Sequence, residues 1–384
     1  MTQCRFFSGY KPCDRSENCD EKCPQLSVPK TRILVVHLEA LGAVLRATSL
    51  LPAIHRKYPD AHVTWVTKGS AKPLLENNPF IDRILTIKEE DLLALSTLSF
   101  DVSYCIDKSL AAGGVLNKPK FIKERFGFGV DSKTGVILPE TNAADELWQL
   151  GLSNEKKFFE NNKPETQLMI EAFELGPFKR DEYVLSLTEN EKHQMRERRQ
   201  HWLNGKKLLV GINTGCSPTI PYKKFTEEGH QQLVRKMLSL DEVRVVLLGG
   251  GSETASNLRI AAGLDVITSP TEAGLRDGAI SIAACDIVIS GDSLGMHMGI
   301  ALKKWVVAWF GPTCAHEIDL YGRGRRVLSQ VSCSPCWKRA CQKSVMCYDR
   351  VDFDHLVHAV EEGIQWLTSS YKQPISETSF SASL

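Results

Sequence analysis

Short apolar runs alternate with segments of helical periodicity twice along this chain of 384 residues. In the first series the runs are Ile33–Leu38, His62–Thr67, Ile84–Ile87 and Val102–Ile106, with helical segments at Leu41–Tyr58 and Ala71–Glu76. Apolar runs of this length, separated by helices, predict parallel strands joined by right-handed crossovers. The first half of the chain is therefore predicted to be a doubly wound α/β domain.

The same alternation restarts after a polar, helix-rich stretch, residues 142–200. We expect strands at Lys207–Asn213, Val243–Leu248 and Val266–Thr268, at a run that contains Asp286, and at Trp305–Phe310, with a helix at Glu227–Leu240. Two doubly wound halves imply a cleft between them, with ligands at the carboxyl ends of the strands.

These patterns divide the chain into five predicted parts. They are a cysteine-rich segment (1–30), an N-terminal domain (31–204), a C-terminal domain (205–352), a terminal helix (353–372) and a tail (373–384). The tail is rich in Ser and Thr, so it is predicted to be disordered.

Bulk properties exclude several classes of protein. The net charge of +1 gives no reason to expect a nucleic-acid partner. No apolar run approaches the ~20 residues that span a bilayer, and the first ten residues lack the apolar core of a signal peptide. We expect a cytoplasmic protein.

The segment from Gly291 to His297 is the strongest sign of a binding site. An apolar strand stops there and a helix-compatible stretch begins, and the free N–H groups of such a helix start bind phosphate. The next predicted strand along the chain, Trp305–Phe310, ends at Gly311-Pro312. Together these features predict a nucleotide diphosphate site.

Within this segment the residues suggest separate roles. We expect Gly295 to allow close approach of the phosphates, and His297 to donate a hydrogen bond to the leaving phosphate. A carboxylate would repel phosphate, so Asp292 is expected to cap the helix and orient its amides. On the alternative interpretation Asp292 is only a cap and His297 is a core histidine.

Twelve cysteines are many for a cytosolic chain, and eight of them fall into two groups. The first group is Cys4, Cys13, Cys19 and Cys23, and the second is Cys333, Cys336, Cys341 and Cys347. Four thiolates suffice for a structural zinc ion or an iron–sulfur cluster, and the second group begins with a C-x₂-C knuckle. Free thiols are the alternative, while disulfides are disfavoured in a reducing compartment.

The chain also resembles a known family. The resemblance is carried by Leu41-Gly42, Leu51-Pro52-Ala53, Tyr58-Pro59-Asp60-Ala61, Asn78-Pro79-Phe80-Ile81-Asp82, Gly211–Phe225, Asp292-Ser293-x-Gly295-x-His297, Phe310-Gly311-Pro312-Thr313 and the second cysteine group. These motifs are similar to those of the heptosyltransferases, glycosyltransferase family 9, over most of residues 31–350.

The resemblance implies a GT-B fold, with two Rossmann-like domains and a cleft between them. It implies inverting transfer of a heptose or related sugar from a nucleotide-diphosphate donor, ADP-heptose first, with no cofactor for catalysis. The implied acceptor is a lipopolysaccharide core or another surface glycan, a glycolipid or oligosaccharide. Such an enzyme works in the cytoplasm, in peripheral contact with the inner membrane.

Carried over residue by residue, the resemblance implies a donor site in the C-terminal half. Its members are Asp292, Ser293, Leu294, Gly295, His297, Lys223 or Lys224, Thr214, Glu253, Gly311 and Pro312. Lysines that only start a helix are disfavoured because their charge opposes the helix dipole. Glu253 could equally support the first turn of a helix.

The main departure from the family is at Ala43. The family has Leu-Gly-Asp-Val at this turn, and its aspartate is the general base, whereas this chain has Leu41-Gly42-Ala43-Val44. Another group can replace the base, and we prefer Glu39 or Asp107 over His37. Slow transfer without a base is a second explanation, since base catalysis contributes ~10²–10⁴-fold. A nucleotide-sugar-binding scaffold with a cysteine-bound metal is the third.

The acceptor side is predicted at Gly42, Ala43, Lys123 and Arg125. The two basic residues belong to a stretch of Lys, Arg and Phe that suits an anionic glycolipid, and a solvated loop is the alternative interpretation. A nicotinamide-dependent dehydrogenase is weakly supported, because Gly249-Gly250-Gly251 lacks the further glycine of a dinucleotide fingerprint.

Overall fold

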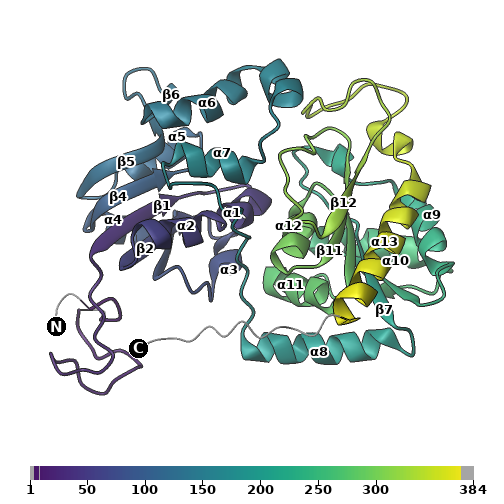
Figure 1. Ribbon diagram of the computed structural model, residues 1–384, viewed down its shortest axis with the longest axis horizontal. Coiled ribbons are helices and arrows are strands. Elements are labelled where there is room, and N and C mark those ends of the chain that lie inside the picture. The colour runs from purple at the N-terminus through teal and green to yellow at the C-terminus, as the bar shows by residue number, and fades with distance from the viewer. Residues whose placement is uncertain (1–3, 8, 373–384) are drawn as a thin grey trace.

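The chain folds into two halves, each built on a six-stranded sheet (Figure 1). The structure, a computed structural model, describes residues 4–7 and 9–372. The strand orders are β3-β2-β1-β4-β5-β6 and β12-β11-β10-β7-β8-β9. Both orders reverse direction beside the first strand of their half, between β1 and β4 and between β7 and β10. In a parallel sheet this reversal is the place where ligands bind.

The predicted parallel sheets are confirmed. The first sheet contains β1 (Thr31–Val36), β2 (Ala61–Thr67), β3 (Arg83–Thr86), β4 (Ser99–Cys105), β5 (Phe121–Val130) and β6 (Ile137–Pro139). The second contains β7 (Leu208–Asn213), β8 (Val243–Leu248), β9 (Ile267–Thr268), β10 (Ile287–Gly291), β11 (Trp305–Phe310) and β12 (Gly324–Leu328). Neighbouring strands are parallel except β5 and β6, which are antiparallel.

Helices cover both faces of each sheet. In the first half they are α1 (Leu41–Ala47), α2 (Leu50–Lys57), α3 (Lys72–Leu75), α4 (Glu89–Ser96), α5 (Leu110–Leu116), α6 (Asp145–Leu152) and α7 (Glu165–Ala172), with the short turns η1 (Asn142–Ala144) and η2 (Lys156–Glu160). In the rest of the chain they are α8 (Glu189–Leu203), α9 (Glu227–Leu238), α10 (Thr254–Ala261), α11 (Gly274–Ala284), α12 (Leu294–Ala301) and α13 (Phe353–Lys372), with η3 (Pro221–Lys223), η4 (Gly251–Glu253) and η5 (Cys347–Arg350).

Two local predictions need correction. The helix expected over Leu41–Tyr58 is two helices, because Thr48 ends α1 and its hydroxyl bonds back to the Leu45 carbonyl at 2.6 Å. The basic stretch around Lys123, for which a solvated loop was the alternative, is strand β5, which pairs with β4 from Phe121 onward. Its outward charges hid the strand pattern, since only the later residues of β5 are buried.

Helix α8 runs along the second half in Figure 1 and packs on α11. Thr188 and Glu191 form a capping box at its start, and Arg198 pairs with Asp277 of α11 at 2.7 Å. Helix α13 returns to the second sheet, where the Trp305 indole donates to the Ala359 carbonyl at 2.9 Å. The domain boundaries stay predictions, and the tail 373–384 lies outside the described residues.

His230 is a buried histidine of α9 that carries a pH prediction. Its side chain bonds the Thr226 carbonyl at 2.9 Å and lies edge-on to Phe225. Burial is the largest cause that lowers its pKa from 6.5 to about 4, with the Thr226 carbonyl opposing the shift. The folded protein therefore binds this proton less readily than the unfolded chain does.

The lowered pKa of His230 contributes to the free energy of unfolding. This contribution is fully present above pH 6.5 and is lost as the pH falls from 6.5 to about 4. We expect His230→Gln to make the loss of melting temperature over this range shallower than in the wild type. Melting curves between about pH 7.5 and about pH 4.5, at steps of roughly half a unit, measure it, because this range covers the titration of an unfolded-state histidine. Identical slopes for the two proteins would contradict the assignment.

Candidate functional site

The predicted phosphate-binding segment, residues 291–297, joins β10 to α12 at the reversal point of the second sheet. Gly291 lies so close to the backbone of Lys223 that a Cβ atom there would meet the Lys223 oxygen at 2.0 Å. A Cβ on Gly295 would meet the Asn213 side chain at 2.6 Å. These glycines therefore bring η3 and the end of β7 against the start of α12.

The start of α12 has no side-chain cap. Its N-cap residue is Ser293, whose hydroxyl instead bonds the Asn213 amide at 3.0 Å. The prediction that Asp292 caps the helix is therefore wrong, because its carboxylate turns to other partners. Without a side-chain oxygen over them, the first N–H groups of α12, from Leu294 onward, suit an anionic ligand.

The Asp292 carboxylate lies between two candidate donor-binding groups. Its oxygens are 3.6 Å from the Lys223 ammonium and 3.7 Å from Nε2 of His297. Burial alone would raise its pKa, yet Lys223 and His297 hold the pKa of Asp292 below its usual range. Asp292 is thus ionised and orients the two groups. Of the two candidate lysines, Lys223 is the one brought to residues 291–297.

His297 is buried where the two halves meet, with 4% of its surface exposed. Its Nδ1 atom has no hydrogen-bond partner among the described residues. The ring stacks on Tyr183 with centroids 6.0 Å apart. Burial first, and then the Arg46 charge, lowers the pKa of His297 to about 3, so the imidazole is neutral at physiological pH. A neutral, buried and unpartnered nitrogen fits a donor phosphate oxygen.

The other donor-site predictions lie around this centre. Thr214 is buried, and its hydroxyl bonds the Leu248 carbonyl at 3.0 Å and Asn257 at 2.6 Å. Glu253 accepts hydrogen bonds from the Gly250 amide and from Ser252, so it holds the glycine-rich turn in place.

Gly311 and Pro312 follow β11, and their carbonyls anchor the cysteine-rich loop of residues 331–346. The Gly311 carbonyl accepts from Ser334 at 2.5 Å. The Pro312 carbonyl accepts from the Cys336 and Trp337 amides at 3.1 and 2.8 Å. The loop is thereby fixed beside the predicted donor site.

Sequence reasoning missed an interface charge cluster formed by Arg46, Lys157, Glu165 and Glu317. Arg46 of α1 pairs with Glu165 of α7 at 2.5 Å. Across the junction between the halves, Lys157 lies 3.4 Å from Glu317 of the loop after β11. Burial and the neighbouring Glu165 raise the pKa of Glu317 to about 7. No sequence spacing links these residues, because α1, η2, α7 and the loop after β11 each supply one of them.

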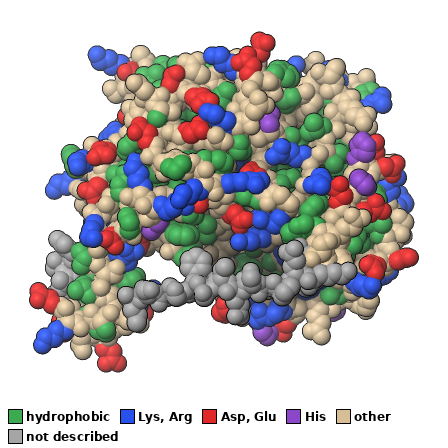
Figure 2. Space-filling view, viewed as in Figure 1, with side chains coloured by type: hydrophobic (Ala, Val, Ile, Leu, Met, Phe, Trp, Pro, Cys, Tyr) green, Lys and Arg blue, Asp and Glu red, His purple; other side chains and the backbone are tan. Residues whose placement is uncertain are grey.

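Figure 2 shows positively charged side chains where the two halves meet. Lys and Arg side chains gather over the middle of the face shown, where the two halves of Figure 1 meet. Such a surface attracts an anionic ligand such as a nucleotide diphosphate.

On the acceptor side the structure separates the two candidate bases. Glu39 is exposed, and its carboxylate lies 2.7 Å from the Lys68 ammonium. Asp107, just after the carboxyl end of β4, lies beside the end of β1 with 11% of its side chain exposed. Its oxygens accept from Nδ1 of His37 at 2.8 Å and from the Leu38 amide. Asp107 thereby orients His37 at the reversal point of the first sheet.

Gly42 and Ala43 stand at the start of α1, which packs on α12. Lys123 lies near the amino end of β5 instead, where it lines a cavity of about 410 Å³ with Lys30, Arg32 and Asp101. Arg125 donates to Asn117 at 3.2 Å. The structure therefore does not bring Lys123 to the junction that holds Gly42.

None of the eight cysteines of the two groups forms a disulfide. Within residues 4–7 and 9–372, neither group contains three sulfur atoms within 4.8 Å of one another. The second group is nevertheless clustered electrostatically. The pKa of Lys343 is raised by its hydrogen bond to Cys333 and by the nearby Cys341 and Cys336. Cys333, Cys336 and Cys341 therefore act on one lysine, and the second group, which also holds the C-x₂-C knuckle, stays a predicted metal site.

Comparison with known proteins shows what the chain is similar to. Residues 162–346, slightly less than half of the chain, match the model of glycosyltransferase family 9 (heptosyltransferase). Lipopolysaccharide heptosyltransferase 2 of Escherichia coli K12 is 23% identical over 307 residues, which cover 73% of this chain and 83% of that protein. The family and this relative are glycosyltransferases.

Solved structures confirm the fold class, two Rossmann-like domains of the GT-B type. A glycosyltransferase of family 9 from Veillonella parvula aligns over 89% of this chain and 99% of its own, with a TM-score of 0.67 at 18% identity. E. coli ADP-heptose lipopolysaccharide heptosyltransferase II aligns over 88% and 99%, with a TM-score of 0.65 at 18% identity. The dodecameric iron-containing heptosyltransferase TibC aligns over 89% and 78%, with a TM-score of 0.54 at 11% identity.

The second half packs against the first half at Gly42, and this contact carries a prediction. A Cβ atom on Gly42 would lie 2.4 Å from Cδ2 of His297, whose ring is held by Tyr183. We expect Gly42→Ala to destabilise the protein by about 1–3 kcal/mol and to weaken nucleotide binding. Gly114→Ala in α5 is the matched control, because nothing lies within 4 Å of that position. Equal melting temperatures for the two variants would contradict the prediction.

Proposed function

We propose that this protein is an inverting heptosyltransferase that takes a heptose or related sugar from ADP-heptose. The proposal rests on the match to family 9 and on the named activities of its relatives. The single observation that carries it is the buried Nδ1 atom of His297, unpartnered within the described chain, beside an uncapped α12 and Lys223. A diphosphate supplies the acceptors that these groups lack.

In the proposed reaction an acceptor hydroxyl attacks the anomeric carbon from the face opposite the diphosphate. The new glycosidic bond forms as the bond from carbon to the diphosphate oxygen breaks, and ADP leaves. Lys223 and His297 would stabilise the negative charge that develops on the leaving phosphate. No cofactor takes part in these steps of the proposal.

The hydroxyl proton needs a base, and Ala43 cannot accept it. Of the predicted candidates, Asp107 is supported better than Glu39, because Glu39 is exposed and paired with Lys68. We propose that Asp107 acts with His37. Asp107 accepts from Nδ1 of His37, so that Nε2 of the same ring takes the proton from the acceptor.

The acceptor is proposed to be a lipopolysaccharide core or another surface glycan, reached at the cytoplasmic face of the inner membrane. Within residues 4–7 and 9–372, no helix has both the length and the apolar character needed to cross a bilayer. Gly42 and Ala43 are proposed to border the acceptor. Lys123 and Arg125 stay predictions for contact with a more distant part of it.

We also propose a structural zinc ion or iron–sulfur cluster at Cys333, Cys336, Cys341 and Cys347. The structural relative TibC is named as an iron-containing heptosyltransferase, which supports the proposal of a metal at this loop. The group would hold the loop against Gly311 and Pro312. No comparable clustering supports the N-terminal cysteines.

The second candidate function is a nucleotide-sugar-binding scaffold without turnover, favoured by Ala43. Thermal shift with ADP-, GDP- and UDP-sugars, followed by a donor hydrolysis assay, separates the two functions. We expect stabilisation by the ADP-sugar together with release of ADP. Stabilisation without release would favour the scaffold, and stabilisation by NAD(H) alone would overturn both.

A further inference from the structure

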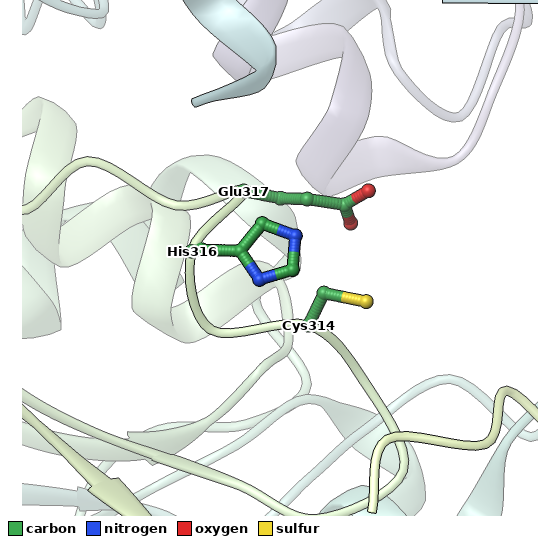
Figure 3. Close-up of side chains that lie close together, drawn as sticks. All are labelled: Cys314, His316 and Glu317. Carbon is green, nitrogen blue, oxygen red and sulfur yellow. The ribbon is translucent and has the colours of Figure 1, made fainter. Parts of the chain in front are cut away.

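The loop after β11 carries three potential metal ligands that the proposed transfer reaction does not use. Cys314, His316 and Glu317 lie on one turn of this loop, and Figure 3 shows their side chains leaving it on the same side. One ligand atom from each lies within 4.8 Å of the other two. We call these residues the 314–317 trio. Cys314 and Glu317 are 2% and 8% exposed, so the trio is largely screened from water.

Each member of the trio is held by a partner outside it. The Trp337 indole donates to the Cys314 sulfur at 3.4 Å. His316 uses Nε2 toward the Lys157 carbonyl at 3.0 Å, which leaves Nδ1 for another partner. The Lys157 ammonium lies 3.4 Å from Glu317 and 4.3 Å from the centre of the Trp337 ring.

This pattern of outer partners is typical of metal ligands. A ligating histidine usually donates its second ring nitrogen to a backbone carbonyl, which fixes the tautomer and the ring orientation. A ligating carboxylate is likewise held by a hydrogen-bond donor. Each of the three bonds a group outside the trio, as metal ligands do.

The ligand set indicates which ion would bind. One thiolate, one imidazole and one carboxylate are the ligand types of zinc, and three protein ligands leave a fourth position open. Calcium and magnesium prefer oxygen ligands alone. We propose that the 314–317 trio binds one zinc ion, at a site separate from the second cysteine group, Cys333, Cys336, Cys341 and Cys347.

The position of the trio gives the ion a consequence for the fold. The backbone N–H of Glu165 donates to the Glu317 carbonyl at 3.0 Å, and Lys157 contacts both His316 and Glu317. Glu165 and Lys157 belong to the first half, whereas the trio belongs to the second. An ion bound by the trio would therefore stabilise the contact of this loop with the first half, beside the predicted donor site.

Cobalt substitution of the full chain tests the proposal. The protein is stripped with EDTA, dialysed against Co²⁺, and examined for thiolate-to-cobalt charge transfer, for four-coordinate d–d bands and for bound cobalt by elemental analysis. We expect Cys314→Ser and His316→Gln to lose one equivalent of cobalt relative to the wild type. The second variant guards against misfolding, because His316 is only partly buried.

Two matched controls keep the outcome specific. Cys216→Ser removes another free cysteine of the same half, and it is expected to keep every equivalent. The double variant Cys333→Ser/Cys336→Ser is expected to keep the equivalent that Cys314→Ser loses. The proposal is overturned if both trio variants bind as much cobalt as the wild type. It is equally overturned if the double variant alone abolishes binding, because all bound metal then belongs to the 331–346 loop.

Discussion

Asp107→Asn is expected to lower kcat for sugar transfer by ~10²–10⁴-fold while leaving the affinity for ADP-heptose within about twofold, a change of less than RT. The carboxylate accepts a hydrogen bond from Nδ1 of His37 and another from the Leu38 amide. An asparagine keeps the shape of the side chain. Its amide can present a donor to His37, which places the ring proton on the wrong nitrogen and removes the base.

The matched control is Glu39→Gln, which removes the other candidate carboxylate from the same region. Glu39 is exposed and paired with Lys68, so we expect its loss to change kcat by less than about twofold. Single-turnover rates at saturating donor measure both variants, with melting temperatures as a check on folding. A large loss in Glu39→Gln with none in Asp107→Asn would reverse the assignment.

His297→Ala is expected to lower kcat/KM for the donor by ~10²–10³-fold, the effect of removing one preorganised donor from developing negative charge. Burial and the Arg46 charge hold the pKa of His297 to about 3. The imidazole is therefore neutral throughout the working range, and its contribution should not change between pH 6 and 9 (a range roughly three units or more above that pKa). The fall in activity of the wild type at low pH should therefore also be observed in His297→Ala.

His230→Ala provides the control, since it also removes a buried histidine of the second half. His230 packs on Phe225 and bonds the Thr226 carbonyl, so its loss should lower stability with a much smaller change in kcat/KM than His297→Ala gives. Calorimetric titration with ADP and steady-state kinetics distinguish the two variants. If His297→Ala lost only stability and kept its turnover, His297 would be a core residue rather than a donor-binding one.

The fold could be predicted in large part because apolar runs and helical periodicity carry it. Runs such as Trp305–Phe310 are buried along their whole length and appear as strands with the predicted bounds. Strand β5 was not predicted because three consecutive charged residues, at positions 123–125, interrupt its first part, which is exposed or half-buried. The break between α1 and α2 escaped because it depends on one hydroxyl, that of Thr48, which also accepts from the Val184 amide 136 residues away.

The candidate site was predictable only where it is local. Residues 291–297 are contiguous, so the sequence places them together. The role of Asp292 depends on Lys223, which reaches it only because Gly291 lets η3 pass close by. The interface charge cluster depends on contacts between the two halves, and such contacts leave no periodic signal in the sequence. The 314–317 trio is local in sequence, yet its outer partners, Lys157 and Trp337, come from distant segments.

The central claim is that the two halves perform sugar transfer and do not merely bind a nucleotide sugar. The most direct test incubates the protein with ADP-heptose and a lipopolysaccharide core that lacks heptose. The proposal predicts one ADP released for each acceptor whose mass rises by one heptose, with inverted configuration at the new linkage. Tight binding of ADP-heptose with neither ADP release nor a change in acceptor mass would contradict it.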